Sequence, residues 1–181
     1  MIVLLTEERS LKVTVDHLIR RHYPRLVEGS DWFVLPFSGK SDLENNILVK
    51  MRCWNYGDPV FVILRDADGG DCVALKQRLR KLAKPAKKPF KIRIVCQELE
   101  SWFLGDAAAV KQAYPRSSFS NEQERYRNPD RLTNASEELA KLTGDSTKVR
   151  RALTIATHLV PSRNCSHSFQ MFGRTLQQLL G

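Results

Sequence analysis

The sequence predicts an α/β fold in which a mainly parallel four-stranded sheet is flanked by helices and followed by an α-helical C-terminal extension. Apolar runs of strand length alternate with amphipathic stretches in the first part of the chain, which is typical of parallel strands covered by helices. The β signals stop after about residue 105. With 181 residues, the chain is close to the length of one domain. We therefore expect an α/β domain over residues 1–105 and a helical extension over residues 106–181 that packs on it.

Four stretches rich in β-branched and aromatic residues are predicted as strands, at residues 2–6, 32–37, 60–65 and 91–97. Apolar positions at helical spacing predict helices between them, at residues 10–21, 41–53 and 71–83. The second of these helices begins with Ser41 and Glu44 at the spacing of a capping box. Start and stop signals in the extension predict helices at residues 106–115, 129–144, 145–161 and 166–181, with a polar loop at 116–128.

The composition bears on partners and location. A net charge of +9 favours a polyanionic partner such as nucleic acid, although the same charge would also serve solubility alone. The four cysteines form no CxxC pair, so a zinc ribbon and a thioredoxin motif are excluded and reduced thiols are expected. The first ten residues lack the basic start of a signal peptide, and no apolar run reaches the roughly 20 residues of a membrane span. We expect a cytoplasmic protein without a membrane partner.

The third predicted strand ends in carboxylates, in the stretch VFVILRDADGGDC at residues 60–72. Asp66 and Asp68 point to the same side if the strand persists that far, at the carboxyl edge where open α/β sheets bind ligands. Like charges held this close are stabilised by a shared proton or a divalent cation. The alternative is that these aspartates, with Asp71, form a turn and the N-cap of the next helix.

Two further strand ends favour a metal site. Glu7 and Glu8 follow the first predicted strand, and Glu98 and Glu100 follow the apolar part of the fourth. Because parallel strands present their carboxyl ends at one edge of the sheet, these acids are expected to converge there, and an all-oxygen cluster favours Mg²⁺ or Mn²⁺ as the cofactor. The predicted ligands are Glu7, Asp66, Asp68 and Glu98, and the further candidates are Glu8, Glu100 and Asp71.

Several basic residues are candidates for holding a polyanion. The stretch KLAKPAKKPFK contains Lys84, Lys87 and Lys88, and a solvated loop is its default interpretation. If the acids cleave a phosphodiester, this loop is available to bind nucleic acid. Lys40 lies near a strand end in SGK, which is too short for a phosphate-binding loop of the Walker type. Arg163 lies in SRNCSHSF, which is either a helix-capping segment or a phosphate contact.

The motifs LTEERS, PFSGKSDLENNI, VFVILRDADGGDCVALKQRL, IVCQELESWFLGD, RNPDRL and ATHLVPSRNCSHSFQMF run almost from end to end of the chain. Together they resemble a bacterial domain-of-unknown-function family with a Toprim-like fold, related to the Toprim domains of topoisomerases, primases and overcoming-lysogenization-type nucleases. The resemblance implies that Glu7 acts as general acid or base and that Asp66 and Asp68 hold the metal. It also makes Glu98 a site residue, with Glu100 turned toward the helical extension.

The resemblance implies a metal-dependent phosphodiesterase acting on DNA or RNA, with catalytic Glu7, Asp66 and Asp68. A nuclease outranks strand passage or priming, because the chain shows no placed topoisomerase tyrosine and no zinc ribbon. An ATPase partner and a role in defence against phage or plasmids are also implied. The alternative is a non-catalytic nucleic-acid-binding or regulatory partner subunit, because Glu8 stands where Toprim domains commonly have Gly and Lys12 where a further acid follows.

Overall fold

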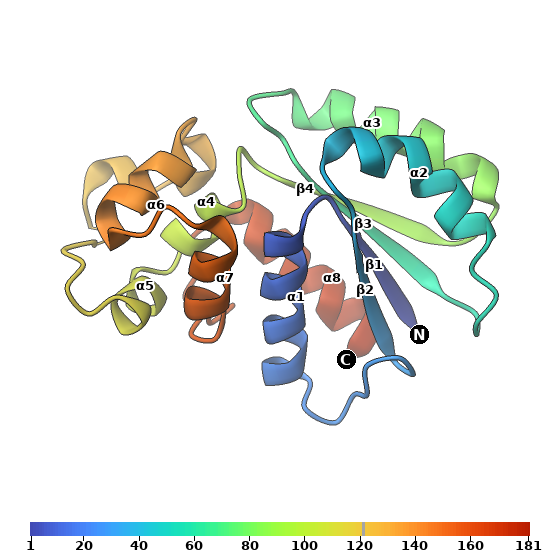
Figure 1. Ribbon diagram of the computed structural model, residues 1–181, viewed down its shortest axis with the longest axis horizontal. Helices are drawn as coiled ribbons and strands as arrows, with labels where there is room; N and C mark the ends of the chain where they lie inside the picture. The colour runs from blue at the N-terminus through green and yellow to red at the C-terminus, as the bar shows by residue number, and fades with distance from the viewer. Residues whose placement is uncertain (121) are drawn as a thin grey trace.

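The computed structural model describes residues 1–120 and 122–181 and confirms the α/β fold with a four-stranded, all-parallel sheet (Figure 1). The strands lie in the order β2-β1-β3-β4. They are β1 (Ile2–Thr6), β2 (Trp32–Pro36), β3 (Val60–Asp66) and β4 (Phe90–Val95). The two central strands are apolar on both faces because helices cover both sides of the sheet.

The helices follow the predicted order, with one short helix more than predicted. They are α1 (Arg9–His22), α2 (Lys40–Arg52), α3 (Cys72–Ala83), α4 (Glu100–Leu104), α5 (Ala107–Ala113), α6 (Ala135–Thr143), α7 (Lys148–Ala156) and α8 (His167–Leu180). Residue 121 of the predicted loop lies outside the described residues. The predicted capping box is wrong, because α2 already begins at Lys40, its N-cap is Gly39, and no side chain caps it.

The sheet separates two apolar cores (Figure 1). Helices α2 and α3 cover one face, where Leu5 of β1 and Ile63 of β3 pack with Leu43 of α2. Helices α1 and α8 cover the other face, where Leu4 of β1 belongs to the same core as Leu176 of α8. This alternation along β1 follows from the two-residue period of a strand.

Helix α8 packs directly on the sheet, although it lies within the predicted helical extension. Arg93 of β4 donates from Nε to the Oγ1 of Thr175 (2.6 Å) and to the carbonyl of Met171 (3.2 Å), both on α8. The core on this face therefore continues across the boundary expected near residue 105. Helices α4 to α7 lie beside the carboxyl edge of the sheet, and α7 packs against α1 (Figure 1). None of the helices in the described part of the chain has the length and apolar character needed to cross a membrane.

Candidate functional site

The sheet reverses its winding between β1 and β3. The chain leaves β1 into α1 on one face, whereas it leaves β3 into α3 on the opposite face. Open α/β sheets bind ligands in the crevice outside the carboxyl ends of the strands at such a switch point. Glu7 directly follows β1 and Asp66 is the last residue of β3, so the topology brings these two predicted site residues to that point.

Glu7 lies largely buried against the end of β3. Its Oε2 accepts a hydrogen bond from the N–H of Asp66 (3.1 Å) and lies 3.8 Å from the Nε of Arg65, a buried cation of β3. Burial raises the pKa of the Glu7 carboxyl, although the Asp66 N–H opposes this shift. The neighbouring charges of Asp68 and Glu8 raise the pKa further. Such a carboxyl exchanges a proton closer to neutral pH than an exposed glutamate does, as a general acid or base requires.

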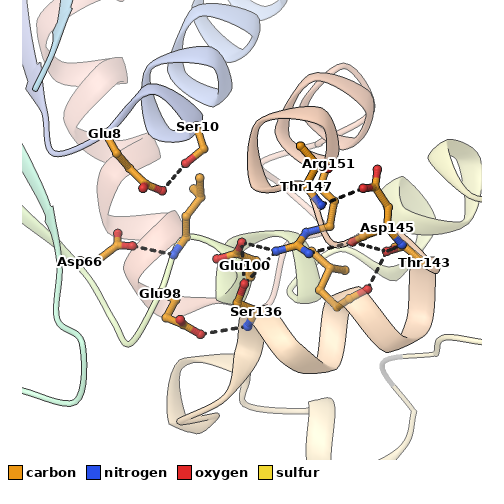
Figure 2. Close-up of polar contacts among 12 residues, drawn as sticks. Glu8, Ser10, Asp66, Glu98, Glu100, Ser136, Thr143, Asp145, Thr147 and Arg151 are labelled. Atoms are coloured by element: carbon orange, nitrogen blue, oxygen red, sulfur yellow. Dashed lines mark hydrogen bonds and ion pairs between the residues drawn. The ribbon is translucent and has the colours of Figure 1, made fainter. Parts of the chain in front are cut away.

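Asp66 is buried, with only 6% of its surface exposed. Its Oδ2 accepts a hydrogen bond from the N–H of Leu99 (3.2 Å), whereas its buried Oδ1 has no hydrogen-bond partner among the described residues (Figure 2). Burial raises the pKa of Asp66 well above its ordinary value of 3.8. The charges of Glu7, Glu8 and Glu100 raise it further. A carboxylate in this environment is stabilised by a proton or by a cation.

Asp68 and Glu8 lie at the rim of this buried pair. Asp68 has a left-handed backbone (φ 49°), so β3 does not continue to it, and its Oδ2 lies 3.2 Å from the Nζ of Lys40. Both of these side chains are more than a third exposed, so the ion pair is weak. Glu8 occupies the N-cap position of α1 and accepts a hydrogen bond from the hydroxyl of Ser10 (Figure 2).

Glu98 and Glu100 are turned toward the helical extension (Figure 2). The Oε2 of Glu98 accepts from the N–H of Ser136 (2.9 Å) at the start of α6. The Oε1 of Glu100 accepts from the hydroxyl of Ser136 (3.1 Å) and from the Nη2 of Arg151 (2.7 Å). Arg151 is buried and also donates to the carbonyl of Asp145 (2.8 Å). Glu98 thus joins the loop after β4 to α6, and Glu100, the first residue of α4, joins that helix to both α6 and α7.

Lys148, the first residue of α7, is a site residue that the sequence analysis missed. Partial burial acts to lower the pKa of its ammonium group, but surrounding carboxylates outweigh this and raise the pKa. Those carboxylates are Glu100, Glu8, Glu98 and Asp66. Lys148 therefore carries positive charge into the acidic edge of the sheet. No local motif marks it, since its role depends on α7 lying against α1.

Asp71 is the N-cap of α3, as the turn-and-cap interpretation predicts. Its Oδ1 accepts hydrogen bonds from the N–H groups of Val73 (2.7 Å) and Ala74 (2.9 Å). These hydrogen bonds explain why a carboxylate lies at this position without any role in binding a metal.

Replacing Asp71 with Ala should lower the free energy of unfolding by about 1 kcal/mol, because two N–H groups at the start of α3 lose their acceptor. Urea denaturation followed by circular dichroism measures this loss. The matched control is Asp68→Asn, which removes only a half-exposed ion pair and should change stability by about 0.5 kcal/mol or less. Equal stabilities of wild type and Asp71→Ala would contradict the capping role.

The basic loop predicted to bind nucleic acid lies at the opposite edge of the sheet from the acids. Lys84 belongs to a 3₁₀ turn, Lys84–Ala86, and Lys87 follows it, so both precede β4. Because β4 is parallel to the other strands, its six residues separate this loop from the carboxyl edge by about 20 Å. Lys88 donates a hydrogen bond to the carbonyl of Trp54, so its ammonium group is already bound within the protein. The loop is therefore not placed to hold a phosphodiester against Glu7 and Asp66.

Arg163 lies between α7 and α8 and is held by contacts within the chain. Its Nε donates to the Oδ1 of Asp106 (2.6 Å), the buried N-cap of α5, and its Nη2 donates to the carbonyl of His158 (2.9 Å). These contacts are those of a residue that fastens the loop before α8.

The acids at the carboxyl edge fit a metal site in which the protein supplies only one or two of the ligands. In residues 1–120 and 122–181, no three His, Cys, Asp or Glu side chains are grouped to hold a metal ion. Mg²⁺ is nevertheless commonly held by one or two carboxylates, with water and substrate phosphates as its other ligands. The unpaired Oδ1 of Asp66 beside the carboxylate of Glu7 fits such a site. Glu98 is directed to Ser136 instead.

Comparison with known proteins identifies the family. The fold is similar to the solved structure of the C-terminal region of the Xanthomonas campestris pv. campestris OLD protein, phased with iodine, with a TM-score of 0.56 and 14% sequence identity over 99% of this chain and 95% of that chain. No curated protein matches the sequence. The family model described as "Domain of unknown function (DUF4276)" matches residues 6–180. Because this match spans nearly the whole sequence, the chain belongs to the DUF4276 family.

Proposed function

We propose that the protein is a Mg²⁺- or Mn²⁺-dependent phosphodiesterase that acts on nucleic acid. The observation that carries this proposal is the buried Asp66 carboxylate, which has one unpaired oxygen and lies beside Glu7 at the switch point of the sheet. Burial and, after it, the charges of neighbouring carboxylates raise the pKa of both groups, and a bound divalent cation relieves such repulsion. The resemblance to Toprim nucleases and the fold shared with the OLD protein region support the same assignment.

In this proposal Glu7 and Asp66 hold the metal. A bound divalent cation supplies charge stabilisation for a phosphoryl group and lowers the pKa of a coordinated water. Glu7 also exchanges the proton of the reaction, as the resemblance to Toprim domains implies. Asp68 lies at the rim with Lys40, where it contributes negative charge close to Glu7.

A polyanionic substrate needs cations near these carboxylates, and the carboxyl edge supplies two. Lys40 begins α2 and Lys148 begins α7, and both side chains are exposed. They lie at helix N-termini, which favour phosphate. We assign the phosphate contacts near the reaction to this pair, and leave any role of Lys84, Lys87 and Lys88 to more distant parts of a long nucleic acid.

Replacing Lys40 and Lys148 with Gln should weaken binding of a single-stranded oligonucleotide and flatten its salt dependence. Each lost phosphate contact should reduce the slope of log K against log salt by about 0.7. Fluorescence anisotropy at several salt concentrations measures the slope. The comparison variant replaces Lys84, Lys87 and Lys88 with Gln, which removes more charge from the opposite edge. If this triple variant alone changes the slope, the nucleic acid binds at the amino edge and our placement is wrong.

The direct test combines metal titration with cleavage of labelled DNA and RNA. Calorimetry should detect Mg²⁺ or Mn²⁺ binding to the wild type, and Glu7→Gln should lose both binding and cleavage. Asp71→Asn is the matched control, because the Asp71 carboxylate serves as the N-cap of α3 and not as a proposed metal ligand, and asparagine also caps helices. Equal heats of metal binding for wild type and Glu7→Gln would contradict the proposed metal site.

The second candidate is a non-catalytic nucleic-acid-binding or regulatory subunit. Two observations favour it: Lys40 pairs with Asp68, and the nearby carboxylates raise the pKa of Lys148, so cations of the chain neutralise part of the cluster. Metal-independent oligonucleotide binding without cleavage would support this candidate. In either case we propose an ATPase partner and a role in defence against phage or plasmids, on the basis of the family resemblance.

A further inference from the structure

Two of the four cysteines meet beside the acidic edge of the sheet. Cys72 is the first residue of α3, and Cys96 directly follows β4. Their Sγ atoms lie 3.6 Å apart, and both residues are partly exposed. Cys53 and Cys165 are exposed and lie elsewhere in the sequence. Two thiols from separate elements are thus in contact at a place that an oxidant reaches.

We propose that Cys72 and Cys96 form a reversible disulfide that fastens the loop after β3 to the loop after β4. A disulfide bond is about 2.05 Å long, so the sulfurs must approach by about 1.5 Å, which rotation of the side chains can supply. The backbone already holds the two loops together. The N–H of Asp68 donates to the carbonyl of Gln97 (2.9 Å), and the N–H of Ala67 donates to the carbonyl of Val95 (2.9 Å).

The oxidant in this proposal is a peroxide. One cysteine sulfur attacks a peroxide oxygen, the O–O bond breaks, and a sulfenic acid and a first water form. The sulfur of the second cysteine then attacks the sulfenic sulfur, the S–O bond breaks, and a second water leaves. In total, two thiols and one hydrogen peroxide give one disulfide and two waters. The two thiols lose two electrons, which reduce the peroxide, and an added dithiol reverses the reaction.

The disulfide would join residues 24 apart in sequence. On one side it would lie close to Asp68 in the loop after β3. On the other side it would lie close to Leu99, whose N–H donates a hydrogen bond to Asp66. It would therefore restrict the two loops that border the carboxylates. Any effect on metal binding rests on the proposed function, whereas the disulfide itself does not. The test below is made with a chelator present, so its result bears on the disulfide alone and not on the proposed metal-dependent function.

The experiment uses the full chain with Cys53→Ser and Cys165→Ser, which leaves only Cys72 and Cys96. After treatment with hydrogen peroxide under native conditions, titration with a thiol reagent should find no free thiol instead of two. Peptide mass spectrometry should find Cys72 joined to Cys96 within one chain, and dithiothreitol should restore both thiols. The melting temperature should rise by roughly 5 °C on oxidation, because the closed loop restricts the unfolded chain.

The control adds Cys72→Ser, so that Cys96 has no thiol neighbour. Peroxide should give no cross-link within this chain, and its remaining thiol should end as sulfenic or sulfinic acid, because no neighbouring thiol captures the sulfenic acid. Three results for the protein that keeps both cysteines would overturn the proposal. They are two thiols that persist in the native protein but react in urea, disulfides that form only between chains, and oxidation that ends in sulfinic acid without a cross-link.

Discussion

Asp66→Asn is expected to raise the melting temperature of the metal-free protein and to abolish its response to Mg²⁺ and Mn²⁺. In the wild type, a buried charge at Asp66 faces the carboxylates of Glu7, Glu8 and Glu100, and its Oδ1 has no hydrogen-bond partner in the described structure. The amide removes that charge, and its oxygen still accepts from the N–H of Leu99. A metal that binds only the folded state stabilises it by an amount that grows with the logarithm of its concentration relative to its Kd, so a variant that no longer binds metal should gain nothing from it.

The effect of Asp66→Asn should depend on pH with a defined sign. Burial first, and then the neighbouring carboxylates, raise the pKa of Asp66 in the folded protein above its ordinary value of 3.8. A protonated Asp66 is therefore favoured by folding, and this contribution is full below pH 3.8 and is lost as pH rises through the folded pKa. The difference in melting temperature between variant and wild type should thus be small near pH 4 and grow toward neutral pH. Metal affinity of the wild type should rise over the same range, since the metal binds the ionised carboxylate.

Cleavage by Asp66→Asn should fall by on the order of 100-fold or more, since even indirect disturbance of metal ligands costs 10- to 100-fold. Asp71→Asn should keep both activity and the metal response. A lower melting temperature of Asp66→Asn at neutral pH, with the metal response intact, would identify Asp66 as a structural residue and would contradict the site.

Arg151→Met is expected to cause a large loss of stability, about 3–5 kcal/mol, because it leaves the buried carboxylate of Glu100 without its cationic partner. Arg151 is 1% exposed and links Glu100, the hydroxyl of Ser136 and the carbonyl of Asp145. For a chain of this length the melting temperature should fall by roughly 10 °C. Differential scanning calorimetry measures both quantities.

The double variant Arg151→Met/Glu100→Gln should recover part of this loss, since it removes the buried charge that the single variant leaves unpaired. Arg150→Met is the control on the same helix and should have a smaller effect, because the Arg150 side chain is 66% exposed and its partner Asp145 keeps hydrogen bonds from the N–H of Thr147 and the hydroxyl of Tyr114. If the double variant is as unstable as the single variant, the loss comes from packing and not from the unpaired carboxylate.

The sequence was sufficient for the sheet, because each strand is a short apolar run with turn signals at both ends. Parallel pairing then placed Glu7 and Asp66 together, since Glu7 follows β1, Asp66 ends β3, and these two strands are neighbours. The same logic places Lys84 at the far edge, because residues that precede a parallel strand lie at its amino end.

The direction of Glu98 and the presence of Lys148 depended on tertiary contacts, whereas the family resemblance had already implied that Glu100 turns toward the extension. Glu98 follows β4, yet it accepts from the N–H of Ser136 in α6, a helix whose position has no signature in the sequence. Lys148 reaches the acids only because α7 packs on α1. The periodicity of an amphipathic helix shows that it has a buried face, but not which neighbour covers that face.

The position of α8 also bears on how the protein is synthesised. The sheet face that carries Leu4 in the first strand is covered in part by Leu176, near the end of the described chain. While the ribosome is still adding residues 167–180, that face of the nascent sheet has no cover from α8. Contacts between such distant segments slow folding and leave apolar surface open to other chains in the meantime. We therefore expect the nascent chain to engage holding chaperones until α8 emerges from the ribosome, and to fold cooperatively only once α8 can pack on the sheet.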